Sequence, residues 1–201
     1  MNKFKVIVIA ISLVFVQAVF AQSSPVPMLE NSASQILSSL KQNKGAIKSN
    51  HQIVYQAIEQ HLLPIVDVTG MSRSVLGREA WNKATPMEKK EFMQAFTQLV
   101  IRTYATPLAE YSSETIKFLP VRGASADAKF MRVNSIISRP NGQDIPLSYN
   151  LVSKNGQWKI YDLSVEGVSL LQSFRSQFGD VLHNSSMKEL IAQMRQNKKA
   201  A

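Results

Sequence analysis

The stretch WKIYDLSVEGVSLLQSFRSQF, from Trp158 to Phe178, changes its hydrophobic period along its length. Up to Val165 apolar and polar residues alternate, which is typical of a half-buried β-strand. After Gly167 the apolar residues recur every three or four positions, which is typical of one face of an α-helix. These residues are Val168, Leu171, Phe174 and Phe178. The stretch therefore predicts a strand that leads into a helix packed against the same sheet.

The alternation shifts by one position inside the predicted strand. Trp158 and Ile160 are apolar at even positions, whereas Leu163 and Val165 are apolar at odd positions. One extra residue in a strand of an antiparallel pair produces such a shift. We therefore expect a β-bulge near Tyr161-Asp162.

The residues before Trp158 predict a hairpin partner for this strand. Asn155-Gly156 favours the positive backbone angles of a two-residue hairpin turn, and Ile145–Ser153 has the composition of the returning strand. The expected pairs are Ser153 with Trp158, Leu151 with Ile160, Tyr149 with Asp162, and Leu147 with Ser164.

Two further segments with strand character, Thr115–Leu119 and Phe130–Ser138, complete a four-stranded antiparallel meander. Helical periodicity and capping signals occupy the rest of the chain. The expected helices are Met28–Gln42, about Asn50 to Leu62, Met71–Leu76 ended by Gly77, Thr85 to about Tyr104 with Pro107 as the stop, and a terminal helix opened by Ser186-Met187-Lys188-Glu189. We therefore predict an α+β fold, in which a helical layer packs over a twisted four-stranded antiparallel sheet.

The N-terminus has the pattern of a secretory signal. Lys3 and Lys5 precede the apolar run Val6–Phe20, and Ala21 supplies the small residue before the expected cut. A membrane anchor is the alternative, but the run is shorter than the roughly 20 residues that a span requires. We predict a cleaved signal peptide at residues 1–21 and a single domain at 22–201, exported to the periplasm.

Composition narrows the possible partners. The chain has no cysteine, which excludes disulfides, thiolate nucleophiles and thiolate metal ligands. Its net charge is +9, with 23 Lys and Arg against 14 Asp and Glu, which favours anionic partners. Export makes nucleic acid the poorest of these partners, so phospholipid headgroups and acidic protein faces are better candidates.

The sequence contains no strong catalytic or metal-binding pattern. His51, His61 and His183 lack the spacing of a metal site on one helix face. Asp162 and Glu166 are more simply explained as structural carboxylates. We keep one enzymatic alternative open, a small pocket in which Asp162 and Tyr149 form an acid–base pair. We otherwise expect no catalytic residue, no metal and no cofactor.

Several motifs resemble the MlaC family, also called the toluene-tolerance family. The longest runs from Trp158 to Leu170 and continues at Phe174–Phe178; RSVLG at Arg73–Gly77 and IPLSY at Ile145–Tyr149 agree with it. The resemblance spans about Gln35 to Met194. Phe174 is a departure, since many members carry tyrosine there.

This resemblance implies a periplasmic phospholipid carrier rather than an enzyme. Such proteins hold acyl chains between a helical layer and a twisted sheet, so we expect an apolar cavity with phospholipid as its cargo. The implied role is to move phospholipid between the outer and inner membranes and so maintain outer-membrane lipid asymmetry. The implied partners are an inner-membrane ABC transporter with a mammalian-cell-entry domain and an outer-membrane lipoprotein–porin complex.

Apolar residues from the helices and the hairpin are the candidates for the cavity wall. We propose Leu76, Phe96, Val100, Tyr104, Leu147, Tyr149, Leu151, Trp158, Ile160, Val168, Leu171 and Phe174. Periodicity alone does not distinguish the wall of a cavity from a filled core. A periplasmic adaptor that binds proteins and no lipid therefore stays open as a second alternative.

Overall fold

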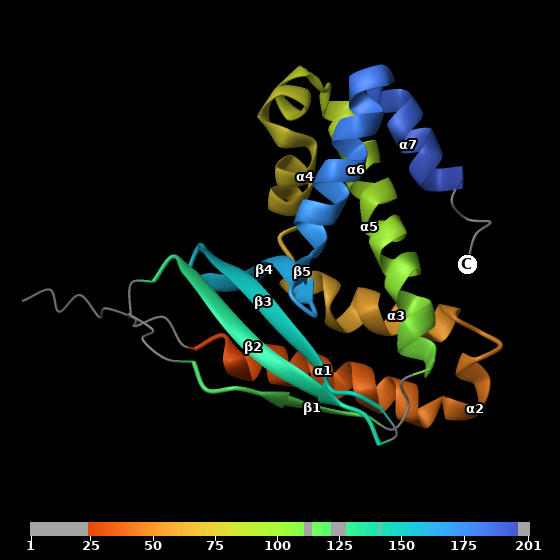
Figure 1. The fold of residues 1–201 in the computed structure, drawn as a ribbon, viewed down its shortest axis with the longest axis vertical. Helices are drawn as coiled ribbons and strands as arrows, with labels where there is room; N and C mark the ends of the chain where they lie inside the picture. The colour runs from red at the N-terminus through yellow and green to blue at the C-terminus, as the bar shows by residue number, and fades with distance from the viewer. Residues whose placement is uncertain (1–23, 111–113, 122–127, 141, 197–201) are drawn as a thin grey trace, which may run out of the picture.

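The computed structural model describes residues 24–110, 114–121, 128–140 and 142–196. The predicted signal peptide, residues 1–21, lies outside them. The described chain folds as helices, an antiparallel sheet, and helices again, which confirms the α+β class (Figure 1). Among the described residues, no helix combines the length and the apolar character that crossing a membrane requires.

The sheet has five strands in the order β1-β2-β3-β4-β5, so the predicted number of four is wrong. The strands are β1 Thr115–Phe118, β2 Phe130–Ser138, β3 Ile145–Lys154, β4 Gln157–Val165 and β5 Val168–Ser169. β5 was expected to be the first turn of a helix. Positive φ angles at Glu166 (51°) and Gly167 (84°) instead reverse the chain, so two residues pair with β4 before the helix begins.

The β3–β4 hairpin confirms the predicted turn and bulge. Ser153 pairs with Trp158 and Leu151 pairs with Ile160, but the register shifts by one between Asn150 and Leu151. Tyr161 is the extra residue, and Asn150 pairs with Asp162 beyond it. The predicted pairing of Tyr149 with Asp162 is therefore wrong, because it ignored the bulge that the parity change had indicated; Tyr149 pairs with Leu163, and Leu147 with Val165 rather than Ser164.

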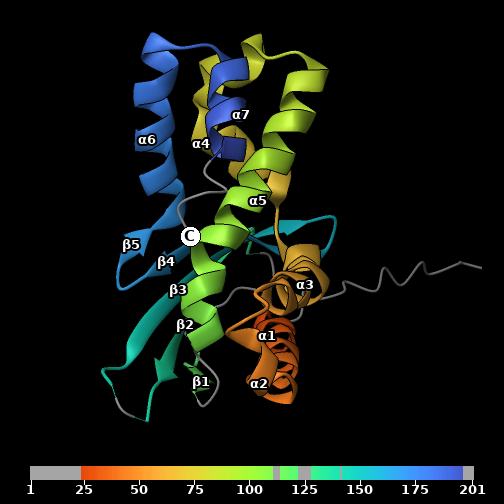
Figure 2. The same ribbon diagram turned by 90° about the vertical axis from the view of Figure 1, so that its right-hand side faces the viewer.

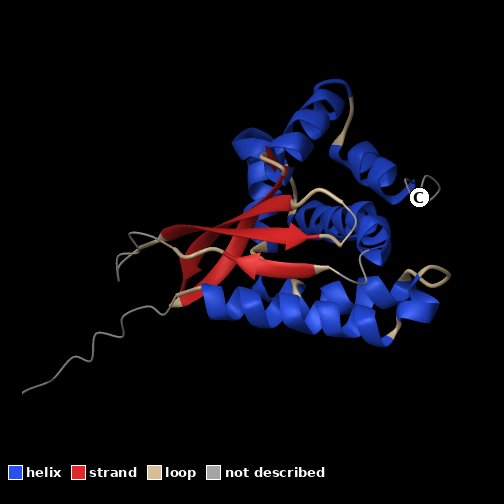
Figure 3. Ribbon diagram, turned by 60° about the horizontal axis from the view of Figure 1, so that its bottom comes forward, coloured by secondary structure: helices blue, strands red, loops and turns tan. Residues whose placement is uncertain are grey.

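The N-terminal helices are α1 Val26–Gln42, α2 Lys44–Ile47, α3 Gln52–His61 and the 3₁₀ turn η1 Leu63–Ile65. Helix α1 lies against one face of the sheet, and α2 and α3 pack against α1. Figure 3 shows α1 extending along the sheet. Leu29 of α1 packs with Val133, Leu147 and Leu151 of the sheet in one buried hydrophobic cluster.

The remaining helices form a bundle that extends beyond the sheet, rather than a layer that only covers it (Figure 1). They are α4 Val68–Lys83, α5 Pro86–Glu110, α6 Leu170–Asn184 and α7 Met187–Gln196. Their core contains a group of aromatic rings, with centroid separations from 5.3 to 5.9 Å. These rings belong to Phe92, Phe96, Phe174 and Phe178.

Helix α5 connects the bundle with the rest of the molecule, as Figure 2 shows. A capping box starts it: the Thr85 amide donates to the Glu88 carboxylate over 2.8 Å, and the Glu88 amide donates to the Thr85 hydroxyl over 3.2 Å. Pro107 was predicted to stop this helix, but α5 continues to Glu110. It is therefore long enough to contribute to the bundle and to the region between α1, α3 and the sheet.

Candidate functional site

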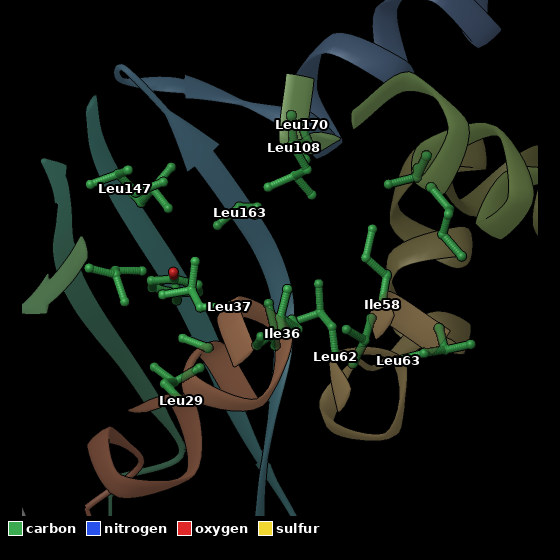
Figure 4. A pocket seen from close by; sticks show the side chains of 18 of the residues that line it. Leu29, Ile36, Leu37, Ile58, Leu62, Leu63, Leu108, Leu147, Leu163 and Leu170 are labelled. Atoms are coloured by element: carbon green, nitrogen blue, oxygen red, sulfur yellow. The ribbon is translucent and has the colours of Figure 1, made fainter. Parts of the chain in front are cut away.

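An apolar cavity lies where the three hydrophobic clusters of the fold meet. The cavity is lined from α1, α3, η1, α4, α5, α6 and strands β1 to β4, and its volume is about 250 Å³. The labelled leucine and isoleucine side chains in Figure 4 surround this common space. Leu29 belongs to the sheet cluster, Leu40 to the α1–α3 cluster and Phe96 to the bundle cluster, so each cluster supplies part of the wall.

Helix α1 reaches the cavity through a stripe of apolar residues. In α1 this stripe is Leu29, Ala33, Ile36, Leu37 and Leu40, which share one face at a spacing of three or four. In the strands, alternate residues point to the same side, so Leu147 and Tyr149 of β3 face the cavity while Ser148 and Asn150 face away. The helical and strand periodicities together produce the apolar wall.

The lining carries very few polar groups. Among the described lining residues, all are hydrophobic except Thr97, Glu114, Thr115 and Tyr149. The Tyr149 hydroxyl accepts a hydrogen bond from the Ser135 hydroxyl over 3.5 Å. Burial raises the pKa of Tyr149, and the Ser135 hydrogen bond offsets part of this effect. Tyr149 is therefore neutral at physiological pH, and its ring presents an apolar surface.

The size of the cavity suits hydrocarbon. The cavity has a volume of about 250 Å³, and one water molecule requires about 10–15 Å³ of such space. The space therefore admits on the order of 20 groups the size of a water or a methylene. An apolar wall gives water few hydrogen-bonding partners, so such a space favours an apolar occupant.

The structure brings five of the twelve predicted wall residues to this cavity: Phe96, Val100, Leu147, Tyr149 and Ile160. The other seven lie elsewhere. Leu76, Leu171 and Phe174 are buried in the bundle cluster, and half-buried Tyr104 packs against it. Leu151 and Trp158 are buried in the sheet cluster. Val168 is 60% exposed on β5.

The sequence prediction omitted the contribution of α1 and α3. The α1 stripe, which includes Leu37, lines the cavity together with Ile58 of α3 and Leu62, which follows that helix. Their helical spacing was visible in the sequence, but an amphipathic helix that lines a cavity has the same pattern as one that packs on a full core. No signal in the sequence separated these residues from ordinary core residues.

The structure does not bring Asp162 and Tyr149 together. Asp162 pairs with Asn150, whereas Tyr149 pairs with Leu163, and neighbouring residues of a strand point to opposite faces. Asp162 is buried and accepts hydrogen bonds from the Leu171 amide (3.1 Å), the Ser169 hydroxyl (2.8 Å) and the Asn150 side-chain amide (3.2 Å). This carboxylate therefore fixes the first turn of α6 on the sheet.

The described titratable residues are not grouped as the ligands of a metal ion would be. Within the described ranges, no group of three or more histidine, cysteine, aspartate or glutamate side chains is placed to hold a metal ion. The candidate functional site is therefore the apolar cavity together with the few polar groups in its lining.

Comparison with known proteins identifies the family. Residues 30–196 match the family model described as "MlaC protein". The chain belongs to the MlaC family. The resemblance found in the motifs around Trp158–Phe178 is thereby confirmed.

Two relatives match most of the chain. The toluene tolerance protein ttg2D of Pseudomonas putida is 30% identical over 165 residues, which are 82% of this chain and 76% of that protein. The intermembrane phospholipid transport system binding protein MlaC of Haemophilus influenzae is 28% identical over 181 residues, or 88% of this chain and 83% of that protein.

A solved structure shares the fold. The phospholipid-binding protein of Ralstonia solanacearum, determined in complex with a phospholipid, superposes with a TM-score of 0.79 at 26% identity. The match covers 87% of this chain and 96% of the Ralstonia chain. The α+β fold is thus shared with a protein whose structure was determined with a bound phospholipid.

Proposed function

We propose that this MlaC-family chain is a periplasmic carrier that holds phospholipid acyl chains in its cavity. The observation that carries the proposal is the apolar wall contributed by three separate hydrophobic clusters around about 250 Å³ of space. The phospholipid bound by the similar Ralstonia protein supports the same choice of ligand.

The energetics of hydrocarbon transfer explain this design. Each buried methylene contributes about 0.8 kcal/mol, so a tail of roughly 15 methylenes contributes on the order of 12 kcal/mol. A lipid that leaves the membrane for water loses this free energy unless a protein covers its tails. A carrier therefore needs a dry, apolar space more than it needs specific polar contacts, and the lining of Leu37, Ile58, Leu163 and their neighbours fits that need.

We further propose that the carrier moves phospholipid between the outer and inner membranes and so maintains outer-membrane lipid asymmetry. The name of the Haemophilus relative, a binding protein of an intermembrane phospholipid transport system, supports this role. The partners would be an inner-membrane ABC transporter with a mammalian-cell-entry domain and an outer-membrane lipoprotein–porin complex. The signal-like residues 1–21 would direct the chain to the periplasm, where both partners are accessible.

In this proposal phospholipid is the cargo, and the protein neither transforms it nor requires a cofactor. The separation of Asp162 and Tyr149 onto opposite sheet faces argues against the acid–base pair that an enzyme would need. The wall candidates outside the cavity, such as Leu171 and Phe174, would act by supporting α6 rather than by contacting lipid.

Native mass spectrometry of the protein purified from cells tests the proposal. We expect the mass of the polypeptide plus phospholipid, with the lipid released at higher collision energy. A bare polypeptide mass, together with failure to take up lipid from vesicles, would contradict the carrier function and favour a protein-binding adaptor. Transfer of labelled phospholipid from donor to acceptor vesicles then tests whether the bound lipid is delivered.

A further inference from the structure

We infer that the face of the sheet opposite the cavity docks an acidic segment of a partner protein, and that Arg132 anchors this segment. Along β2, Phe130, Arg132 and Asn134 are exposed, whereas Val133 and Ser135 on the cavity side are buried. Figure 3 shows α1 on the other side of the sheet. Arg132 and its exposed neighbours therefore lie on a face that α1 leaves open to a partner.

A polar hollow lies on this face. Residues of β2, β3, β4, β5 and α6 and of the turn before β5 line it, and each of them is polar or glycine: Arg132, Ser148, Asn150, Asp162, Ser164, Gly167, Ser169 and Gln172. The Arg132 Nε atom donates to the Asn150 side-chain oxygen over 2.8 Å, and the Asn150 amide donates to Asp162 over 3.2 Å. Asp162 also accepts from Ser169 and from the Leu171 amide, so both of its oxygens are occupied. The sheet thus holds Arg132 in place although its side chain is exposed.

The hollow offers a guanidinium without an acidic partner. Among the described residues, no carboxylate forms an ion pair with Arg132, and its terminal nitrogens form no hydrogen bond. The side chains of Ser164 and Gln172 are likewise bonded to no described residue. An exposed acid, Glu166, adjoins Gly167 beyond β4, two strands away from Arg132. A guanidinium only donates, and it pairs best with a carboxylate or phosphate through two parallel hydrogen bonds. The complementary ligand is therefore an anion with oxygen acceptors.

An aromatic ring beside Arg132 favours a protein as the source of this anion. Phe130 is 66% exposed and lies two residues from Arg132 on the same side of β2. Its ring packs edge-on against Tyr161 with a centroid separation of 6.0 Å, which limits its motion. Arginine and aromatic residues together are typical of the residues that dominate binding in protein interfaces. A single exposed ring inserts little apolar surface into a bilayer, and the net charge of +9 favours an acidic partner.

Photocrosslinking in intact cells tests the inference. The full chain is produced with p-benzoylphenylalanine, a photoreactive analogue of phenylalanine, in place of Phe130 or of Met87, which is equally exposed but lies at the start of α5. We expect the analogue at Phe130, and not at Met87, to crosslink to a partner protein at a peptide rich in Asp and Glu. Adding Arg132→Glu should reduce this adduct at least about fivefold. Arg73→Glu reverses the charge of an exposed arginine of α4 and should leave the adduct unchanged.

Each outcome decides the inference. No adduct, an adduct at a segment without carboxylates, or an adduct that Arg132→Glu leaves unchanged overturns it. Flotation of the chain with phosphatidylglycerol vesicles that depends on Arg132, without a protein adduct, would assign this face to the membrane and also overturn it. If thermal unfolding shows that Arg132→Glu does not fold, Arg132→Gln takes its place and must reduce the adduct. Native mass spectrometry of the same variants should find lipid bound as in the wild type, so failure of the docking face and failure of the carrier function are distinguishable.

Discussion

At the residue scale, Asp162 is a buried carboxylate of β4 that connects this strand with three neighbouring elements. It receives hydrogen bonds from Asn150 of β3, from Ser169 of β5 and from the Leu171 amide in the first turn of α6. A negative charge is favourable at a helix N-terminus, where amide groups lack partners in the helix. Leu170, next to Leu171, lines the cavity. Asp162 thus positions part of the cavity wall without itself lining the cavity.

A charge placed in the cavity should prevent lipid binding without unfolding the protein. Leu37 lines the cavity and is half-buried. In Leu37→Asp the carboxylate can keep water when the cavity is empty, but it must lose that water against an acyl chain. We expect lipid content, measured by native mass spectrometry, to fall at least fivefold. The thermal unfolding midpoint of the empty protein should change little.

Val168→Asp is the matched control for Leu37→Asp. Val168 was a predicted wall residue, but it is 60% exposed and does not line the cavity. Its charged variant should bind lipid as the wild type does. If Val168→Asp lost lipid and Leu37→Asp kept it, the assignment of the cavity would be wrong.

At the element scale, the strands and helix starts were predictable because their signals are local. The two-residue turn at Asn155-Gly156, the bulge near Tyr161 and the capping box at Thr85 were all expected and are all present. The fifth strand was not predictable, since Val168–Ser169 is too short to show a period. The run of α5 through Pro107 was missed because proline favours a helix end but does not require one.

Gly77 controls the shape of α4. Its φ of 74° and ψ of 167° interrupt the helix in a region that other residues rarely adopt. A Cβ at this position would meet no atom within 4 Å, so the cost of Gly77→Ala is backbone strain alone. We expect a loss of about 1–3 kcal/mol in the free energy of unfolding, measured by chemical denaturation.

Gly45→Ala provides the comparison. Gly45 lies in α2, and an added Cβ there also meets no atom within 4 Å. Since alanine favours a helix more than glycine does, this variant should gain up to about 1 kcal/mol. Equal effects of the two substitutions would show that the break in α4 is not a backbone requirement.

The two capping boxes make stability sensitive to acid. Hydrogen bonds from the Thr85 amide and hydroxyl lower the pKa of Glu88 below its ordinary value of 4.5, and those from Ser186 do the same for Glu189. A lowered folded-state pKa stabilises the protein above the unfolded value, and this contribution disappears as pH falls through the folded value.

We therefore expect the double variant Glu88→Gln/Glu189→Gln to be less stable than wild type at pH 7. The difference should shrink between about pH 5 and pH 3, as urea unfolding at each pH would show. Glu30→Gln alters an exposed α1 glutamate and serves as the control. A constant difference across this range would contradict the proposed cause.

At the scale of the whole molecule, the interior is divided into three clusters around a space instead of forming one core. The sequence shows which residues are apolar and which of them share a helix or strand face. It does not show which of these faces border the cavity. Leu171 and Phe174 show the same periodicity as lining residues, yet they pack in the bundle. Whether an apolar residue lines the cavity depends on the distance between the packed helices and strands. The hydrophobic periodicity of a sequence contains no information about that distance.

Filling this space should stabilise the fold. A ligand that binds only the folded state raises the free energy of unfolding by RT ln(1 + [L]/Kd). We expect the delipidated protein to unfold at a lower temperature than the lipid-loaded protein in differential scanning calorimetry. Reloading from vesicles should restore the higher midpoint. Identical midpoints for empty and reloaded protein would mean that lipid does not occupy the interior.

The apolar lining also affects which amino-acid substitutions the protein can accept during evolution. A wall that recognises hydrocarbon by excluding water accepts leucine, isoleucine, valine or methionine almost interchangeably, provided that volume is kept. Mutational drift in Ile36 or Leu163 should therefore be tolerated, while a backbone position such as Gly77 is constrained. This chain and the Ralstonia protein are 26% identical and superpose with a TM-score of 0.79, which agrees with a wall that depends on hydrophobicity and volume more than on residue identity.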